Sequence, residues 1–289
     1  MEASQMLIQV LNGISYGLLL FLIASGLSLI FGLMGVINLA HGSFYMMGTY
    51  AGIEIYRLTG SFTLSLIVAA LAVSVIGGLV ERIFLSKLYK QELDQVLLTF
   101  GFAYIFMDLC KWFWGGTPRS LPKPSLLDRS VTILGDDFPL YRLSLIVVGV
   151  IVAIALQLFL EKTRTGMIIR AGVDDKEMVG GIGINIKLYF TGIFILGALL
   201  AAIGGVVGGP VIGAYVGMDS DILVLALAVV VVGGLGTLKG AFWGSLLIGL
   251  IETFGKVFLP NYSIITVYAA MVLILIFKPQ GLFGKEEEA

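Results

Sequence analysis

The sequence predicts an all-α polytopic membrane protein that crosses the bilayer eight or nine times. Of its 289 residues, 58% are hydrophobic and 13% are charged, whereas charged residues make up roughly 25% of an ordinary soluble domain. The charges are clustered, so long runs contain no Asp, Glu, Lys or Arg. The chain also holds 38 glycines, where an average chain of this length would hold about 20.

Charge-free runs locate the spans, because a charge at the bilayer centre costs at least about 2.5 kcal/mol and a crossing helix needs about 20 apolar residues. The first run, residues 3–53, is long enough for two crossings with a turn inside the membrane. Further spans are expected in the runs 58–80, 143–160, 188–218, 222–238 and 257–277. Two shorter runs, 95–107 and 240–251, reach span length only if the flanking Asp108, Glu252 and Lys256 face protein, water or the interface.

These runs leave no room for a soluble domain, so residues 1–289 are expected to form a single transmembrane domain. Its larger loops are an external one at about 109–142 and a cytoplasmic one at about 161–187. With 81–94, 161–187, Lys239 and the C-terminus inside, the cytoplasmic side holds eleven Lys and Arg and the outer side seven, as the positive-inside rule favours. Nine spans would place the N-terminus outside, and eight would place it inside.

The first long run contains a glycine-rich stretch, Gly26 to Ser43, in which the apolar periodicity is interrupted. Asn38 and Ser43 are good N-cap residues, so either could begin a new helix after a non-helical turn. Broken backbone inside a membrane is tolerated only against protein or a wet cavity, and a helix start there suits an anionic carboxylate. The alternative is a simple loop at the membrane face.

Residues His41–Tyr45 resemble residues Lys239–Trp243, since both read basic, Gly, small, Phe, aromatic after a glycine-rich stretch. Transporters often contain repeats with broken helices at matching positions. We therefore expect an internal two-fold repeat whose halves meet near these segments.

Small residues recur at four-residue spacing between 197 and 209, which predicts close helix packing. Ala201, Gly205 and Gly209 form one stripe, and Gly204 and Gly208 form a second. In lipid, helices associate through such small residues because no hydrophobic drive operates between them.

Several classes of function are excluded by composition. The formal net charge of -1 provides no basic field for nucleic acid. The single cysteine, Cys110, cannot form an internal disulfide, and the single histidine, His41, cannot build a zinc site, so no metal is expected. The chain lacks a phosphate-binding G-x-x-x-x-G-K-[ST] motif and a G-x-S-x-G nucleophile elbow. We expect no enzyme activity and no catalytic residue.

Acids within membrane spans are functional by default, and proton-coupled carriers use them as relays. Here each acid near a span end has a cation three or four residues away, which favours pairing: Glu54 with Arg57, Asp108 with Lys111, and Glu252 with Lys256. His41 could carry a proton, although a hydrogen-bonded structural histidine beside a helix break is the simpler interpretation.

The loop at 161–187 mixes charged and exposed apolar residues. Asp174 suits an N-cap, Glu177 stands at the capping-box position, and Met178 is available to a partner. This pattern predicts a short surface helix that docks on a soluble subunit, or else a solvated connector.

The sequence resembles the permease subunits of ATP-binding-cassette importers for branched-chain amino acids, specifically the H-type (LivH) subunit. The resemblance lies in the stretch from Gly26 to Gly42, the loop Arg170 to Asn185 and the segment Val229 to Gly240, and it extends over essentially the whole chain. One departure is Val179-Gly180-Gly181, where the family has an alanine-containing step.

The resemblance implies a multi-pass subunit in a bacterial plasma (inner) membrane, in contact with lipid. Its partners would be an M-type permease, two ATPase subunits and a periplasmic or extracellular solute-binding protein. ATP and Mg would bind the ATPase subunits, and no cofactor would bind this chain. Asn38, His41 and Ser43 would lie near the substrate path. The ATPase contact would comprise Arg170, Asp174, Asp175, Glu177 and Met178.

Two other functions compete with this expectation. One is a stand-alone channel or secondary carrier for a small polar solute such as urea. The other is a structural half of a heteromeric pore, with the substrate contacts on the partner chain.

Overall fold

The computed structural model describes residues 3–89, 91–174, 176–181 and 183–284, and most of these are helical. The long helices are α1 (Ala3–Met34), α2 (His41–Thr59), α3 (Phe62–Ile83), α4 (Glu92–Trp114), α5 (Leu140–Lys162), α8 (Ile186–Ile212), α9 (Met218–Gly233), α10 (Leu238–Phe258) and α11 (Ser263–Phe277). The shorter elements are α6 (Arg164–Asp174), α7 (Lys176–Gly181), the 3-10 turns η1 (Leu85–Lys87) and η2 (Pro260–Tyr262), and the strands β1 (Ser130–Ile133) and β2 (Asp136–Pro139).

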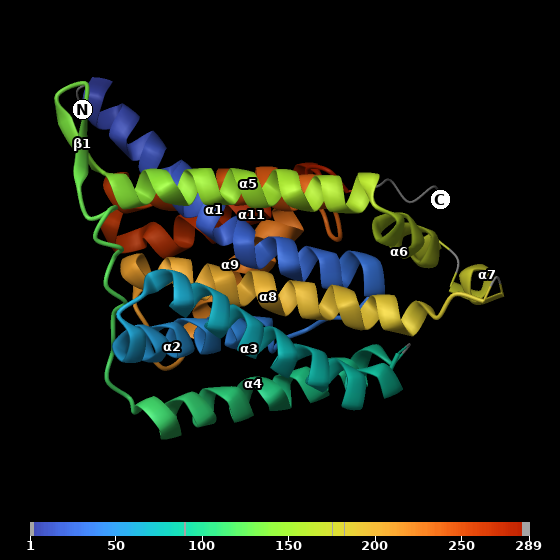
Figure 1. The fold of residues 1–289 in the computed structure, drawn as a ribbon. Coiled ribbons are helices and arrows are strands. Elements are labelled where there is room, and N and C mark those ends of the chain that lie inside the picture. Colours follow the sequence, from blue (N-terminus) through green and yellow to red (C-terminus); the bar gives the residue numbers. More distant parts are fainter. Residues whose placement is uncertain (1–2, 90, 175, 182, 285–289) are drawn as a thin grey trace.

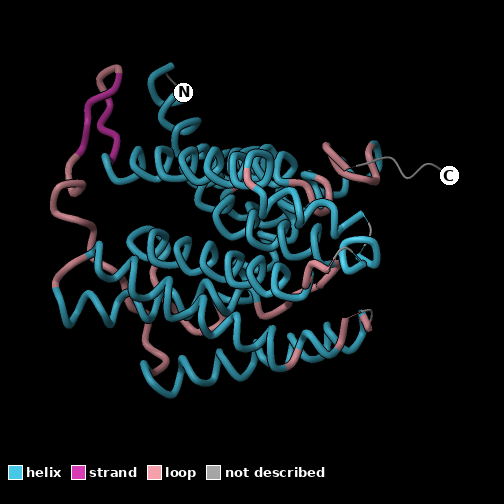
Figure 2. The backbone as a smooth tube through the Cα atoms, turned by 45° about the vertical axis from the view of Figure 1, so that its right-hand side comes forward, coloured by secondary structure: helices cyan, strands magenta, loops and turns pink. Residues whose placement is uncertain are grey.

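The long helices lie side by side in one bundle (Figures 1 and 2). Six of the described helices are long and apolar enough to cross a membrane, namely α1, α3, α4, α5, α8 and α10. The apolar α11 is shorter, and α2 and α9 fall below the same limits. The all-α membrane fold is therefore confirmed, whereas the count of eight or nine spans stays a prediction.

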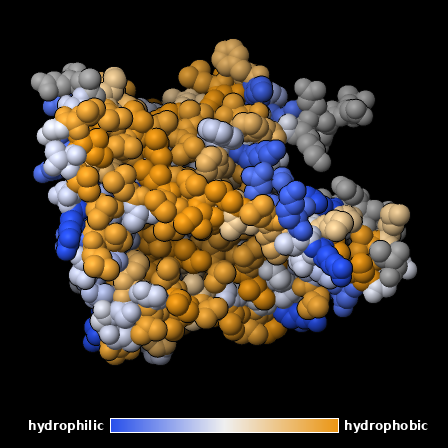
Figure 3. Space-filling view, turned by 45° about the horizontal axis from the view of Figure 1, so that its top comes forward, coloured by the Kyte–Doolittle hydropathy of each residue, from blue (hydrophilic) through white to orange (hydrophobic). Residues whose placement is uncertain are grey.

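An apolar body separates two polar ends, as a membrane-spanning protein requires. Figure 3 shows hydrophobic side chains over the middle of the visible face and hydrophilic ones toward its two sides. The N-terminal end of α1 lies beside the β1–β2 hairpin, whereas α6, α7 and the C-terminal end lie at the opposite end (Figure 1). The first described helix therefore begins at one end of the bundle, and the last described residues lie at the other.

The segments predicted to share the cytoplasmic side do lie at one end of the bundle. Tyr89, in the turn between α3 and α4, stacks edge-on against Phe190 near the start of α8. Gly234, at the end of α9, contacts Gly284 in the C-terminal segment. We call this the α6–α7 end and the other the hairpin end.

The predicted loops are shorter than expected, and one of them contains strands. The outer loop runs from 115 to 139, not from 109 to 142, because α4 continues to Trp114 and α5 already begins at Leu140. Within it, β1 and β2 pair antiparallel across Leu134 (φ 50°) and Gly135 (φ 94°). Two left-handed residues are what a two-residue hairpin turn needs.

The small-residue stripes of α8 are confirmed as packing surfaces. Ala201, Gly204, Gly205, Gly208 and Gly209 are all buried. A methyl group on Gly205 would overlap the backbone oxygen of Tyr45 in α2, and one on Gly208 would overlap the Tyr45 hydroxyl. The stripes therefore let α8 lie directly against α2.

The packing supports an internal repeat, but with different partners from those expected. α1 packs on α10 as α8 packs on α3, and α2 and α9 pack on each other. α1 and α8 run in opposite directions (Figure 1), as two inverted halves, α1–α3 and α8–α10, would require. In that pairing His41–Tyr45 opens α2, whereas Lys239–Trp243 opens α10, the counterpart of α3. Both segments form the first turn of a helix after a glycine-rich break, which accounts for their similar composition.

Candidate translocation site

The predicted break between α1 and α2 lies inside the bundle. Gly35 (φ 66°) ends α1, and residues 35–40 are non-helical. The N–H of Leu39 donates to the hydroxyl of Thr99 in α4 (3.1 Å). Thr99 is about two turns, or about 10 Å, from the start of α4 at Glu92. Val36, Asn38 and Ala40 are buried, so most of the break lies against protein, the setting that irregular backbone in a membrane needs.

Asn38 closes the turn, although neither Asn38 nor Ser43 is the N-cap. α2 begins at His41, so the N-cap is Ala40, which has no side-chain cap. The Asn38 side-chain oxygen accepts the N–H of Ala40 (3.1 Å), and the Asn38 carbonyl accepts the N–H of His41 (3.3 Å). Asn38 therefore stabilises the turn that leads into α2, two residues before the N-cap Ala40.

The first turn of α2 meets the first turn of α9. The Ser43 hydroxyl donates to Oδ2 of Asp219 (3.1 Å), and both residues are buried. A methyl group on Gly42 would overlap the backbone oxygen of Asp219. His41 Nε2 lies 3.1 Å from the carbonyl oxygen of Ile23 in α1. We call this contact, formed by His41, Gly42, Ser43 and Asp219, the α2–α9 junction.

Asp219 is a site residue that the sequence did not reveal. It lies between the charge-free runs 188–218 and 222–238, whereas in the structure it is the second residue of α9 and is 4% exposed. A carboxylate in a first helical turn complements the positive end of the helix dipole. The anion expected near the start of α2 is thus supplied by the chain itself.

Three buried polar atoms beside the break have no hydrogen-bond partner among the residues that the structure describes: Asn38 Nδ2, His41 Nδ1 and Asp219 Oδ1. Asn38 also lines a small, mostly apolar cavity of about 200 Å³ between α1 and α9. His41 and Ser43 are almost completely buried. The three predicted path residues therefore adjoin one another in a closed region of the bundle.

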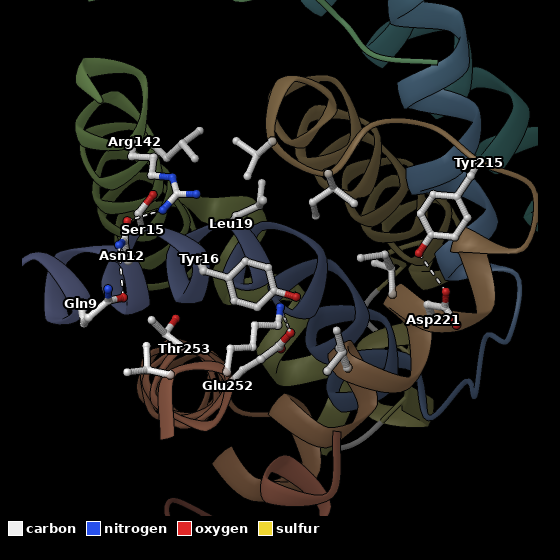
Figure 4. Close-up of a pocket in the computed structure, with 17 residues that line it drawn as sticks. Gln9, Asn12, Ser15, Tyr16, Leu19, Arg142, Tyr215, Asp221, Glu252 and Thr253 are labelled. Carbon is white, nitrogen blue, oxygen red and sulfur yellow. Dashed lines mark hydrogen bonds and ion pairs between the residues drawn. The ribbon is translucent and has the colours of Figure 1, made fainter. Parts of the chain in front are cut away.

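A larger polar cavity of about 550 Å³ opens between α1, α5, α8, α9 and α10 toward the hairpin end. We call it the polar cavity. Figure 4 shows Tyr16 between Arg142 and Glu252, with Tyr215 and Asp221 together at another edge. Its polar and charged lining residues are Gln9, Asn12, Ser15, Tyr16, Arg142, Tyr215, Asp221, Glu252, Thr253 and Lys256.

Two of the three predicted acid–cation pairs form. Glu54 pairs with Arg57 (2.5 Å), and Glu252 pairs with Lys256 (2.7 Å). Asp108 is exposed on α4 and forms no ion pair with any described residue. Glu252 belongs to the polar cavity, so its pair with Lys256 lies in a candidate solute path.

A further buried acid, Glu81 in α3, lies near the α6–α7 end. It is fully buried, and the Tyr89 hydroxyl donates to its carboxylate. Burial together with this carboxylate raises the pKa of Tyr89 far above its usual range, so the phenol keeps its proton and remains the donor.

The segment between α5 and α8 contains two short helices, where the sequence predicted one beginning at Asp174. α6 starts at Arg164, and the Thr163 hydroxyl accepts the N–H of Gly166 (3.0 Å) as a cap. A side chain at Gly166 would overlap the last carbonyls of α5. This glycine serves close packing and does not interrupt the helix.

Four of the five predicted ATPase-contact residues belong to α6 and α7, which lie at one end of the bundle (Figure 1) and contribute no lining residue to the polar cavity. Arg170 is exposed on α6, and Met178 on α7 is 70% exposed. Asp174 is the last residue of α6, and Glu177 belongs to α7. Asp175 lies outside the described residues.

The sequence is similar to a known family and to several of its members. A family model for the permease component of branched-chain amino acid transport systems matches residues 9–277. The high-affinity branched-chain amino acid transport system permease protein BraD of Pseudomonas aeruginosa is 29% identical, with 96% of each chain covered. LivH of Escherichia coli, which carries the same description, is 28% identical with the same coverage.

More distant matches include an archaeal protein and a solved structure. A probable branched-chain amino acid transport permease protein LivH of Methanocaldococcus jannaschii is 27% identical, with 94% of this chain and 91% of the relative covered. The structure of PsaBC from Streptococcus pneumoniae in complex with Fab shares 14% identity, with 94% of this chain and 92% of that chain covered and a TM-score of 0.49.

Proposed function

The chain belongs to the family of branched-chain amino acid transport permease components, and from this we propose that it is the transmembrane subunit of an ATP-driven importer. In this proposal it translocates branched-chain amino acids or similar small solutes. The observation that carries the proposal is the family match, which extends from α1 to the end of α11. The relatives named above are permeases, so this chain is a transport subunit and ATP hydrolysis belongs to separate subunits.

The proposal includes partners for both ends of the bundle. An M-type permease would complete the membrane part, and a periplasmic or extracellular binding protein would deliver solute at the hairpin end. Two ATPase subunits, which hold ATP and Mg, would dock at the α6–α7 end. The two helices that project there support this assignment, because an exposed helix with charged and apolar side chains suits a protein partner (Figure 1). The membrane would be the bacterial inner membrane.

The polar cavity and the α2–α9 junction fit alternating access. The cavity opens toward the hairpin end, whereas the junction closes the bundle interior through backbone contact. Movement of α2 against α9 would separate buried polar groups, and nucleotide-driven closure of the ATPases would supply that movement.

The rival function, a stand-alone channel or carrier, would need neither the ATPase subunits nor ATP. We propose to reconstitute this chain alone and, separately, the complex of both permeases and both ATPases with the binding protein, and to measure uptake of radiolabelled leucine. We expect ATP-dependent uptake only from the complex. Uptake by the chain alone, or leucine uptake by the complex without ATP, would overturn the proposal.

A further inference from the structure

The polar cavity has two chemically different walls. One wall comes from α1, α5 and α10 and carries the polar atoms of Asn12, Ser15, Arg142 and Glu252. The wall from α8 and α9 is mainly apolar, with Val211, Ile212, Ile222 and Leu225 beside Asp221, whereas Leu19, Leu145 and Val257 lie on the first wall. A ligand that fits both walls has a charged or polar head and an aliphatic side chain.

Arg142 supplies a positive charge that no acid neutralises. Its guanidinium donates to the side-chain oxygen of Asn12 and forms no ion pair with any residue in the described part of the chain. The amide fixes the direction of the guanidinium and leaves its charge uncompensated. Arginine binds carboxylates well because its planar donors match the two carboxylate oxygens.

Glu252 supplies the complementary group. Oε1 pairs with Lys256 (2.7 Å), and the carboxylate side chain is only 12% exposed. Its second oxygen, Oε2, is buried and has no partner among the described residues. Ser15, 2% exposed, likewise lines the cavity with an unpartnered hydroxyl. A buried carboxylate oxygen without a donor is an acceptor available to an ammonium group.

The remaining charges of the cavity are already engaged. Asp221 accepts from the Tyr215 hydroxyl (2.8 Å), and Lys256 is held by Glu252 and lies 5.4 Å from the centre of the Tyr16 ring. With two cations and two acids in the lining, the cavity has no net charge. An overall neutral ligand that carries both charges matches this balance.

We propose that the polar cavity binds an aliphatic α-amino acid as its zwitterion, with Arg142 on the carboxylate and Glu252 Oε2 on the ammonium. The aliphatic side chain then lies against the apolar wall of α8 and α9. The inference rests on the proposed function and deepens it, because it places a substrate site within this chain and not only on its partner permease.

The test is equilibrium binding of three probes to the purified importer complex in nanodiscs, without the binding protein. The probes are L-leucine, L-leucinamide, which lacks the carboxylate, and 4-methylpentanoate, which lacks the ammonium. We expect Arg142→Gln to weaken L-leucine binding by about tenfold or more and to leave L-leucinamide binding unchanged. Glu252→Gln should weaken L-leucine binding similarly and leave 4-methylpentanoate binding unchanged.

Arg142→Lys keeps the charge and should retain more affinity than Arg142→Gln. Lys123→Gln and Asp128→Asn are the matched controls, since these residues form an ion pair (3.6 Å) in the outer loop away from the cavity lining. Both controls should bind L-leucine as the parent does.

Three outcomes would overturn the inference: no L-leucine binding by the parent complex, unchanged L-leucine binding in both cavity variants, or equal losses for L-leucine and for the probe that lacks the relevant charge. The last would show a structural role for the side chain. Leucine uptake by the same preparation with the binding protein present tests the proposed function separately, so the two failures are distinguishable.

Discussion

Gly42 is the residue that admits the closest backbone contact at the α2–α9 junction. Gly42→Ala would place a methyl group on the backbone oxygen of Asp219, which cannot rotate away. We expect the variant to lose about 1–3 kcal/mol of stability and to melt at a lower temperature in detergent. Gly101→Ala, on an open face of α4 with no neighbour within 4 Å, should melt at or above the parent temperature. Equal melting of the two variants would contradict this account of the junction.

Asn38 and His41 offer a second test at the scale of single side chains. Asn38→Ala removes the acceptor of the buried Ala40 N–H, and His41→Ala removes the ring that contacts the Ile23 carbonyl. An unsatisfied buried group costs about 1–3 kcal/mol, so both changes should distort the helix break. If that cost is carried into the barrier for transport, leucine uptake by the reconstituted complex should fall about fivefold or more in each, since about 1.4 kcal/mol of barrier corresponds to a factor of ten. The exposed Asn261→Ala is the control, and full uptake in both variants would remove these residues from the path.

At the scale of elements, α6 and α7 are the candidates for transmitting ATP-driven motion. Reversing one charge there, in Arg170→Glu or Glu177→Lys, should place like charges across the interface, which repel. We expect weaker co-purification of the ATPases, or ATP hydrolysis that is uncoupled from leucine uptake. Lys123→Glu makes the same reversal at the hairpin end, where we expect no effect on either readout. Normal assembly together with normal uptake in both α6–α7 variants would refute the assignment.

The helix break could be predicted from sequence, but its counterpart in the other half could not. Glycines beside Asn38 indicated an interruption within a charge-free run, and a break at residues 35–40 confirms it. The start of α9 could not be predicted, since two acidic residues, Asp219 and Asp221, are typical of a loop outside the membrane. Only tertiary packing places Asp219 against Ser43 and makes its burial tolerable.

The extent of helix between 161 and 187 could not be predicted from sequence. The charges there show only that the segment lies outside the membrane, and Gly166 and Gly172 have low helix propensity. In the fold, Gly166 lies against the end of α5 and Gly172 against Ile186, so close packing outweighs propensity. The polar cavity was missed because its residues come from five helices that sequence reasoning does not bring together.

For the whole molecule, the placement of the two ends predicts an orientation. Cys110 is the single cysteine of the sequence and is 1% exposed. Cys110→Ala gives a cysteine-free chain. In that background, Leu134→Cys labels the hairpin and Gly180→Cys labels α7. With the α6–α7 end in the cytoplasm, an impermeant maleimide should label the hairpin cysteine in intact spheroplasts and the α7 cysteine only after permeabilisation. The reverse pattern would invert the topology. Labelling of both sites in intact spheroplasts would contradict their placement at opposite ends.

The backbone contact between Gly42 and Asp219 also has a mechanical consequence. Flexible side chains between two helices can absorb a displacement by changing rotamer. Two backbones in direct contact cannot adjust in this way. A shift of α9 along its axis is therefore passed on directly to the start of α2. In this arrangement a displacement that begins at one end of the bundle would reach its centre through two helices in direct backbone contact.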